Sequence, residues 1–133
     1  MRPPVNRRYH DRHVLTPDAA ACVEFGYPTP QGHPCKMQLR DVSASGLSVV
    51  LSHELPGLEA GSRIDGAVLT VGERVFRADL LVMHVTPEPT QGGVFGALVY
   101  PERDRDILTL RKVITELEGR EATPQVRGRT RRF

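Results

Sequence analysis

Residues 34–51 read PCKMQLRDVSASGLSVVL, and this stretch decides the fold. In each half of it, apolar residues stand at every second position. These positions are Cys35, Met37 and Leu39, and then Leu47, Val49 and Leu51. A period of two is typical of a strand that buries one face and leaves the other in water. The stretch therefore predicts two neighbouring β-strands with a turn at residues 41–46.

The same period continues on both sides of this stretch. Residues 19–25 form an earlier strand-like run, and a longer hairpin connection rich in Gly and Pro joins it to residues 34–41. Later runs are expected at residues 67–71, 75–85 and 93–99, with a tight reversal at residues 71–74. The apolar phase shifts between Phe76 and Leu81, which predicts a β-bulge there. We therefore expect an all-β fold with one helix, in which six to seven antiparallel strands close into a barrel.

From about Glu102 the apolar period changes from two to three or four. The new stripe consists of Ile107, Leu110, Ile114 and Leu117, and Gly119 is the expected C-cap. This pattern predicts a C-terminal amphipathic helix that closes one end of the barrel. The residues beyond it have little to bury, so we expect disorder. The predicted organisation is a flexible N-terminal arm at 1–18, a barrel plus helix at 19–119 and a disordered basic tail at 120–133.

Composition sets limits on the class of protein. A chain of 133 residues is one domain by length, and its net charge of +2 conceals arginine clusters at both ends. It has neither an apolar stretch of transmembrane length nor a hydrophobic segment behind its basic N-terminus, so we expect a cytoplasmic protein. Cys22 and Cys35 are interpreted as small core residues rather than a disulfide, because they lack a paired motif and the expected compartment is reducing.

Two motifs carry the candidate function: Arg7-Arg8-x-x-x-Arg12 on the N-terminal arm, and Asp41-x-Ser43-x-x-Gly46. Arginine offers forked donors and a flat cationic face, which suit phosphates and the edges and faces of guanine. A carboxylate accepts from the N1 and N2 donors of guanine, a serine hydroxyl can add a hydrogen bond, and glycine lets backbone approach a ligand. Together these groups indicate a purine dinucleotide site.

In order and spacing the two motifs resemble the PilZ domain, a bacterial receptor domain for cyclic di-GMP, and the resemblance spans residues 6–117. It implies that Arg7, Arg8 and Arg12 hold phosphates and guanines, Asp41 and Ser43 read a guanine edge, and Gly46 lines the site. The position of Arg7 before the spaced pair further implies an intercalated ligand dimer. The ligand would order the N-terminal arm and relay a signal to an effector protein, with no cofactor, no metal and no catalysis.

Other functions stay open at this point. Some members of the PilZ family act without ligand as protein-interaction modules, although those usually lack the arginines. The two arginine-rich ends could also serve a nonspecific nucleic-acid-binding barrel. A zinc site from His10, His13, Cys22 and Cys35 lacks a knuckle spacing. An enzyme is disfavoured because the chain has neither a GxSxG elbow nor a P-loop.

Overall fold

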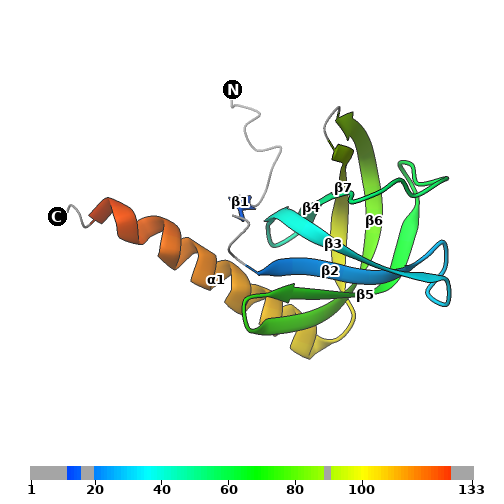
Figure 1. The fold of residues 1–133 in the computed structure, drawn as a ribbon. Helices are drawn as coiled ribbons and strands as arrows, with labels where there is room; N and C mark the ends of the chain where they lie inside the picture. The colour runs from blue at the N-terminus through cyan, green and yellow to red at the C-terminus, as the bar shows by residue number, and fades with distance from the viewer. Residues whose placement is uncertain (1–11, 16–19, 89–90, 127–133) are drawn as a thin grey trace, which may run out of the picture.

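The computed structural model describes residues 12–15, 20–88 and 91–126, which form seven strands and one helix (Figure 1). The strands are β1 (His13–Val14), β2 (Ala21–Tyr27), β3 (His33–Val42), β4 (Gly46–Val50), β5 (Arg63–Val71), β6 (Arg74–Glu88) and β7 (Gln91–Pro101). The helix α1 (Asp104–Val126) follows β7 directly. The run of strands and the single C-terminal helix confirm the predicted all-β class.

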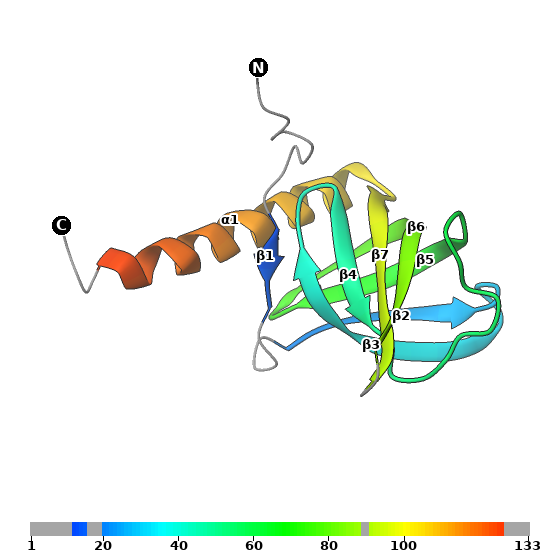
Figure 2. The ribbon, with the colours of Figure 1, turned by 90° about the horizontal axis from the view of Figure 1, so that it is seen from above.

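The strands β2 to β7 close into an antiparallel barrel of six strands. Their order is β3-β2-β5-β6-β7-β4, and β4 pairs back onto β3 to complete the ring. The short β1 is an extra strand that lies beside the last residues of β3, opposite β4. Figure 2 shows the barrel from above, with α1 lying across one end of it. The predicted closed barrel of six to seven strands is therefore confirmed.

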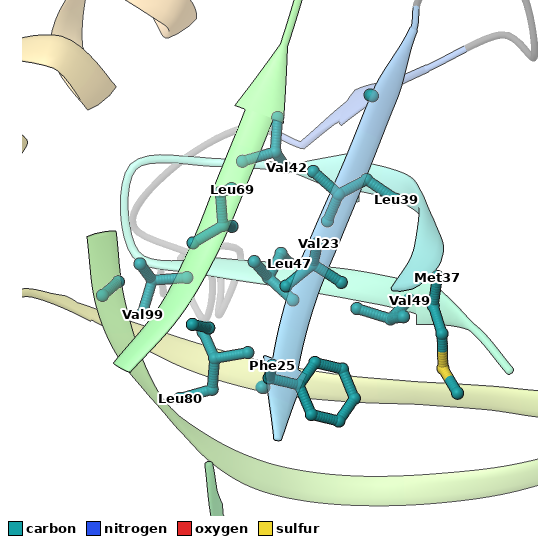
Figure 3. Close-up of a cluster of buried hydrophobic side chains, with 14 of the residues drawn as sticks. Val23, Phe25, Met37, Leu39, Val42, Leu47, Val49, Leu69, Leu80 and Val99 are labelled. Carbon is teal, nitrogen blue, oxygen red and sulfur yellow. The ribbon is translucent and has the colours of Figure 1, made fainter. Parts of the chain in front are cut away.

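Side chains of alternating strand residues fill the barrel. Residues of this core drawn in Figure 3 are Val23, Phe25, Met37, Leu39, Val42, Leu47, Val49, Leu69, Leu80 and Val99. The apolar positions read from residues 34–51 are all buried. Cys35 is buried and Cys22 half-buried, and both are free thiols, so no disulfide joins them. Burial on one face of each strand is what a period of two predicts.

A bulge in β6 lies beyond the predicted place. Phe76, Ala78, Leu80 and Val82 are all buried, so the strand keeps its phase through the region where we expected a shift. The register against β7 changes between Val82 and His84 instead. Leu81 is apolar but lies half-buried on the outer face, and its apolar side chain is the reason why the phase shift was predicted too early. The bulge therefore lies between Val82 and His84, just after the predicted region of residues 76–81.

The reversal between β5 and β6 occurs where the sequence predicts it. Val71 pairs with Arg74, and only two residues lie between them. Gly72 has φ 61°, the left-handed value that the first position of a type II′ turn requires. Arg74 then donates to Glu116 of α1 through Nη2 at 2.7 Å, so the turn is also tied to the helix.

The helix α1 is anchored at its first turn and packs against β6, β7 and β1. The carboxylate of Asp106 is 6% exposed and accepts from the backbone N–H groups of Arg103 at 3.1 Å and of Arg77, on β6, at 3.0 Å. The predicted C-cap at Gly119 is wrong, because α1 continues to Val126. The predicted tail boundary at residue 120 therefore falls inside the helix. Among the described residues, no helix is long and apolar enough to cross a bilayer.

Candidate ligand-binding site

The two motifs meet where β1 lies beside the end of β3. His13 pairs with Val42 and Val14 pairs with Asp41, which brings Arg12 over the β3–β4 side of the barrel. Nη1 of Arg12 donates to Oδ1 of Asp41 at 2.6 Å. The Arg12 side chain is 36% exposed and that of Asp41 is 14% exposed, so the pair sits at the protein surface. The structure thus brings together one residue from each motif.

A bulge in β3 aims Asp41 outward. The register against β4 shifts between Leu39 and Asp41, so β3 carries one extra residue there, Arg40. Leu39 and Val42 both point into the core, and the residues between them face out. Asp41 then lies opposite Ser48 of β4. Bulges commonly re-aim a side chain beside a functional site, and this one exposes the carboxylate that a regular strand would turn inward.

Ser43 lies beneath the turn between β3 and β4. It is 2% exposed, and its hydroxyl accepts from the backbone N–H of Gly46 at 3.0 Å and of Ser45 at 3.3 Å. The same hydroxyl donates to the carbonyl oxygen of Gly46 at 3.2 Å, and the Ser43 N–H donates to that oxygen at 2.8 Å. These bonds hold the turn closed. They favour a role for Ser43 in positioning its neighbours. The predicted direct contact of Ser43 with a guanine edge is less consistent with these bonds.

Gly46 leaves room for the arginine. A Cβ atom added at this position would lie 3.1 Å from the carbonyl oxygen of Ala97 and 3.6 Å from Nη2 of Arg12. The contact with the β7 backbone would be tight, while the distance to the guanidinium is an ordinary van der Waals contact. The glycine is therefore explained by its close packing against β7, and its contact with a ligand stays a prediction.

One polar residue of this site was missed by the sequence reasoning. Ser48 is 8% exposed, and its hydroxyl accepts from Nη1 of Arg12 at 3.3 Å. The signal for it was present, because Ser48 stands two residues after Gly46 on the same strand and so shares its outward face. Arg12 is consequently held by two acceptors from two different strands.

The other predicted site residues have different outcomes. Arg7 and Arg8 lie outside the described residues, as does His10. Within the described ranges, no cluster of three or more His, Cys, Asp or Glu residues is suited to a metal ion. A groove of about 470 Å³ runs between the β3–β4 turn and α1, lined by Ala44, Pro101, Ile107, Leu110, Arg111, Ile114 and Thr115. Its position places an apolar surface next to the candidate site.

Solved structures share this fold across most of the chain. Escherichia coli YcgR in complex with c-di-GMP has a TM-score of 0.72 and 18% identity, covering 92% of this chain and 51% of that one. The K. pneumoniae MrkH–c-di-GMP complex has a TM-score of 0.71 and 18% identity, covering 89% and 54%. The PilZ domain of E. coli YcgR with c-di-GMP has a TM-score of 0.66 and 17% identity, covering 90% and 99%.

The chain spans about half the length of YcgR and of MrkH, and nearly the whole of the isolated YcgR domain. No protein-family model and no curated protein sequence matches it. At 17–18% identity the likeness lies in the three-dimensional structure, over 89–92% of this chain. This chain has the fold of a PilZ domain.

Proposed function

We propose that this chain is a bacterial receptor for cyclic di-GMP. The observation that carries the proposal is the junction of Arg12, Asp41 and Gly46 on the outer wall of a barrel. The solved structures with the same fold include complexes with this dinucleotide. A forked cation beside an outward carboxylate supplies both kinds of group that a guanine nucleotide needs, a phosphate binder and an acceptor for the base.

In this proposal each site residue has a distinct role. Arg7, Arg8 and Arg12 bind phosphates and guanine faces, while Asp41 accepts from the N1 and N2 donors of one guanine. The bond from Arg12 goes to Oδ1 of Asp41, and we assign Oδ2 to the base. Ser43 and Gly46 act through shape: the serine fixes the turn and the glycine admits Arg12 and the ligand.

The ligand also provides the signal. Three of the proposed contact residues, Arg7, Arg8 and Arg12, precede β1 in the sequence. The others lie at residues 41–46 of the barrel, so in this proposal a dinucleotide bridges the arm and the barrel. Two anionic phosphates facing three arginines favour the ordering of the arm. We infer that an effector protein in the cytoplasm reads the altered surface, and that the chain acts as an adaptor without catalysis.

Titration calorimetry with cyclic di-GMP, cyclic di-AMP and GMP tests the proposal. Adenine offers no N1 or N2 donors to Asp41, so an unpaired carboxylate would cost about 1 to 3 kcal/mol, or roughly tenfold in affinity. We expect selective binding of cyclic di-GMP, with two ligands per chain, because Arg7 adds a guanidinium for a second ligand. One ligand per chain would contradict the intercalated dimer alone.

The alternatives have their own signatures in the same experiment. No heat with any nucleotide would favour a ligand-independent interaction module. Equal binding of all three nucleotides, with a steep dependence on salt, would favour a nonspecific nucleic-acid binder. The pairing of Arg12 with Asp41 favours the selective receptor. In a site that binds only phosphate, an outward carboxylate beside the arginine would repel the ligand.

A further inference from the structure

Arg40 stands beside Asp41 on the outer face of β3. Gln38 and Arg40 are both exposed, and Leu39 between them is buried, so this part of the strand alternates in the regular way. The bulge after Leu39 then puts Asp41 on the outer face that Arg40 already occupies. A cation and an anion thus stand at consecutive positions of one strand, with their Cα atoms about 3.8 Å apart.

The backbone of Arg40 is fixed at the place where β1 meets β3. Its carbonyl oxygen accepts from the N–H of Leu15 at 2.9 Å, and Val14 pairs with Asp41 one residue further along. On the other edge of β3, Ser48 of β4 lies opposite Asp41. The side chain of Arg40 therefore starts from a strand that is hydrogen-bonded on both edges, within the wall that carries the candidate site.

The electrostatic balance of this wall depends on Arg40. Arg12 donates to Asp41 at 2.6 Å, so the positive charge of the guanidinium is offset by the negative charge of the carboxylate. Over residues 12–15 and 38–50, the one other exposed side chain that is charged at neutral pH is Arg40. It leaves this wall with a net positive charge, which is the sign that attracts an anionic ligand.

We propose that Arg40 is a further ligand-binding residue, whose guanidinium binds a phosphate of the dinucleotide. The inference rests on the proposed function and adds to its site a barrel residue that belongs to neither motif. Arginine binds phosphate through charge-assisted hydrogen bonds, for which its fork of donors is well suited. Because Arg40 adjoins the carboxylate that we assign to a guanine, neighbouring positions of β3 hold a base and a phosphate of the same ligand.

Calorimetry with cyclic di-GMP at a low and a high salt concentration tests this assignment in the full chain. Arg40→Ala removes the charge, and Arg40→Lys keeps the charge without the fork or the flat face. Arg77→Ala is the matched control, because Arg77 is also an exposed arginine on a barrel strand. It lies on β6, which is separated from β3 by two strands in either direction around the barrel. Thermal unfolding of each variant verifies that the barrel stays folded.

Loss of one charge-assisted contact predicts about tenfold weaker binding of cyclic di-GMP by Arg40→Ala. The affinity of Arg40→Ala should also fall less steeply with salt than that of the parent chain, because one screened attraction is gone. We expect Arg40→Lys to bind within about threefold of the parent, since an ammonium group also binds phosphate. Arg77→Ala should bind like the parent.

The outcomes that contradict the assignment differ from those that contradict the proposed function. Parent-like binding by Arg40→Ala would overturn the assignment and leave the proposed function intact. A loss in Arg40→Lys as large as in Arg40→Ala, with the salt dependence of the parent, would overturn the phosphate contact, because it would indicate stacking on a base. An equal loss in Arg77→Ala would overturn the assignment too, because it would indicate an effect of net charge alone. A parent chain that binds no cyclic di-GMP would overturn both the proposed function and this extension.

Discussion

At the scale of single residues, Arg12 and Asp41 organise the site for each other. The ion pair at 2.6 Å and the bond to Ser48 hold the guanidinium in one orientation, on a side chain that otherwise has many rotamers. Binding to donors that are already oriented costs less protein side-chain entropy than binding that must first order them. The pair is therefore better understood as preorganisation of the site than as a source of barrel stability, since exposed ion pairs contribute little to stability.

Replacement of Arg12 by lysine separates shape from charge. Lysine keeps the positive charge but cannot reach Asp41 and Ser48 while presenting a second nitrogen near Gly46, as the fork of Arg12 does. We expect Arg12→Lys to bind cyclic di-GMP about tenfold more weakly, in line with the loss of one bidentate contact. Arg63→Lys, at an exposed pair with Asp65, is the control that should change nothing. Equal binding by Arg12→Lys would show that charge alone matters.

Removal of the Ser43 hydroxyl tests the role that the structure favours for it. In Ser43→Ala the backbone N–H groups of Ser45 and Gly46 lose their acceptor. We expect the free energy of unfolding to fall by about 1 to 3 kcal/mol, as measured by urea denaturation. Ser52→Ala, in an exposed bend, should leave it unchanged. A fully stable Ser43→Ala that fails to bind the ligand would instead restore the direct contact.

The residues of the site differ in how far sequence could identify them. Asp41 and Gly46 stay predicted ligand contacts, and the structure places both of them beside Arg12, as their motif spacing allows. The burial of Ser43 was not foreseen, since a short polar side chain between two strands can face either water or backbone. Ser48 lies outside the motifs, and its place opposite Asp41 depends on the register and the bulge between β3 and β4.

At the scale of elements, Asp106 fastens α1 to the barrel. Its carboxylate satisfies one N–H at the start of the helix and one on β6. In Asp106→Ala both N–H groups lose this acceptor, so we expect a loss of about 1 to 3 kcal/mol in the free energy of unfolding. Asp104→Ala, on the exposed side of the same turn, should cost about 1 kcal/mol or less through the helix dipole. Comparable losses in both variants would contradict an anchoring role specific to Asp106.

Strand periodicity made most of the elements predictable. Every strand of the barrel has an expected counterpart, because alternation and Gly or Pro punctuation are local signals. The two-residue β1 and the positions of the bulges could not be predicted, since both are defined by the partner strand. Gly119 misled the reading of the helix, because a single glycine lowers helix propensity by about 1 kcal/mol without ending a helix.

At the scale of the whole molecule, the proposed mechanism has the ligand bring the arm and the barrel together. Arg12 of the first motif lies directly before β1, where β1 pairs with β3, while Asp41 belongs to β3 itself. We expect saturating cyclic di-GMP to slow amide hydrogen exchange through residues 6–14, because a bridging ligand ties this segment to the barrel. Cyclic di-AMP at the same concentration is the control and should have little effect. Unchanged exchange through residues 6–14 with cyclic di-GMP would contradict the proposal that the ligand orders the arm.

The pairing of β4 with β7 has a further consequence, for the time at which the candidate site exists. This pairing joins residues 46–50 to residues 94–98, and Gly46 and Ser48 of the candidate site lie on it. Contacts between segments so distant in sequence form slowly, after the local hairpins. On a ribosome, a chain that has not yet reached Gly96 lacks the strand partner of Ser48. Under the proposed function, nascent and partly unfolded copies leave cyclic di-GMP free, and only completed barrels bind it.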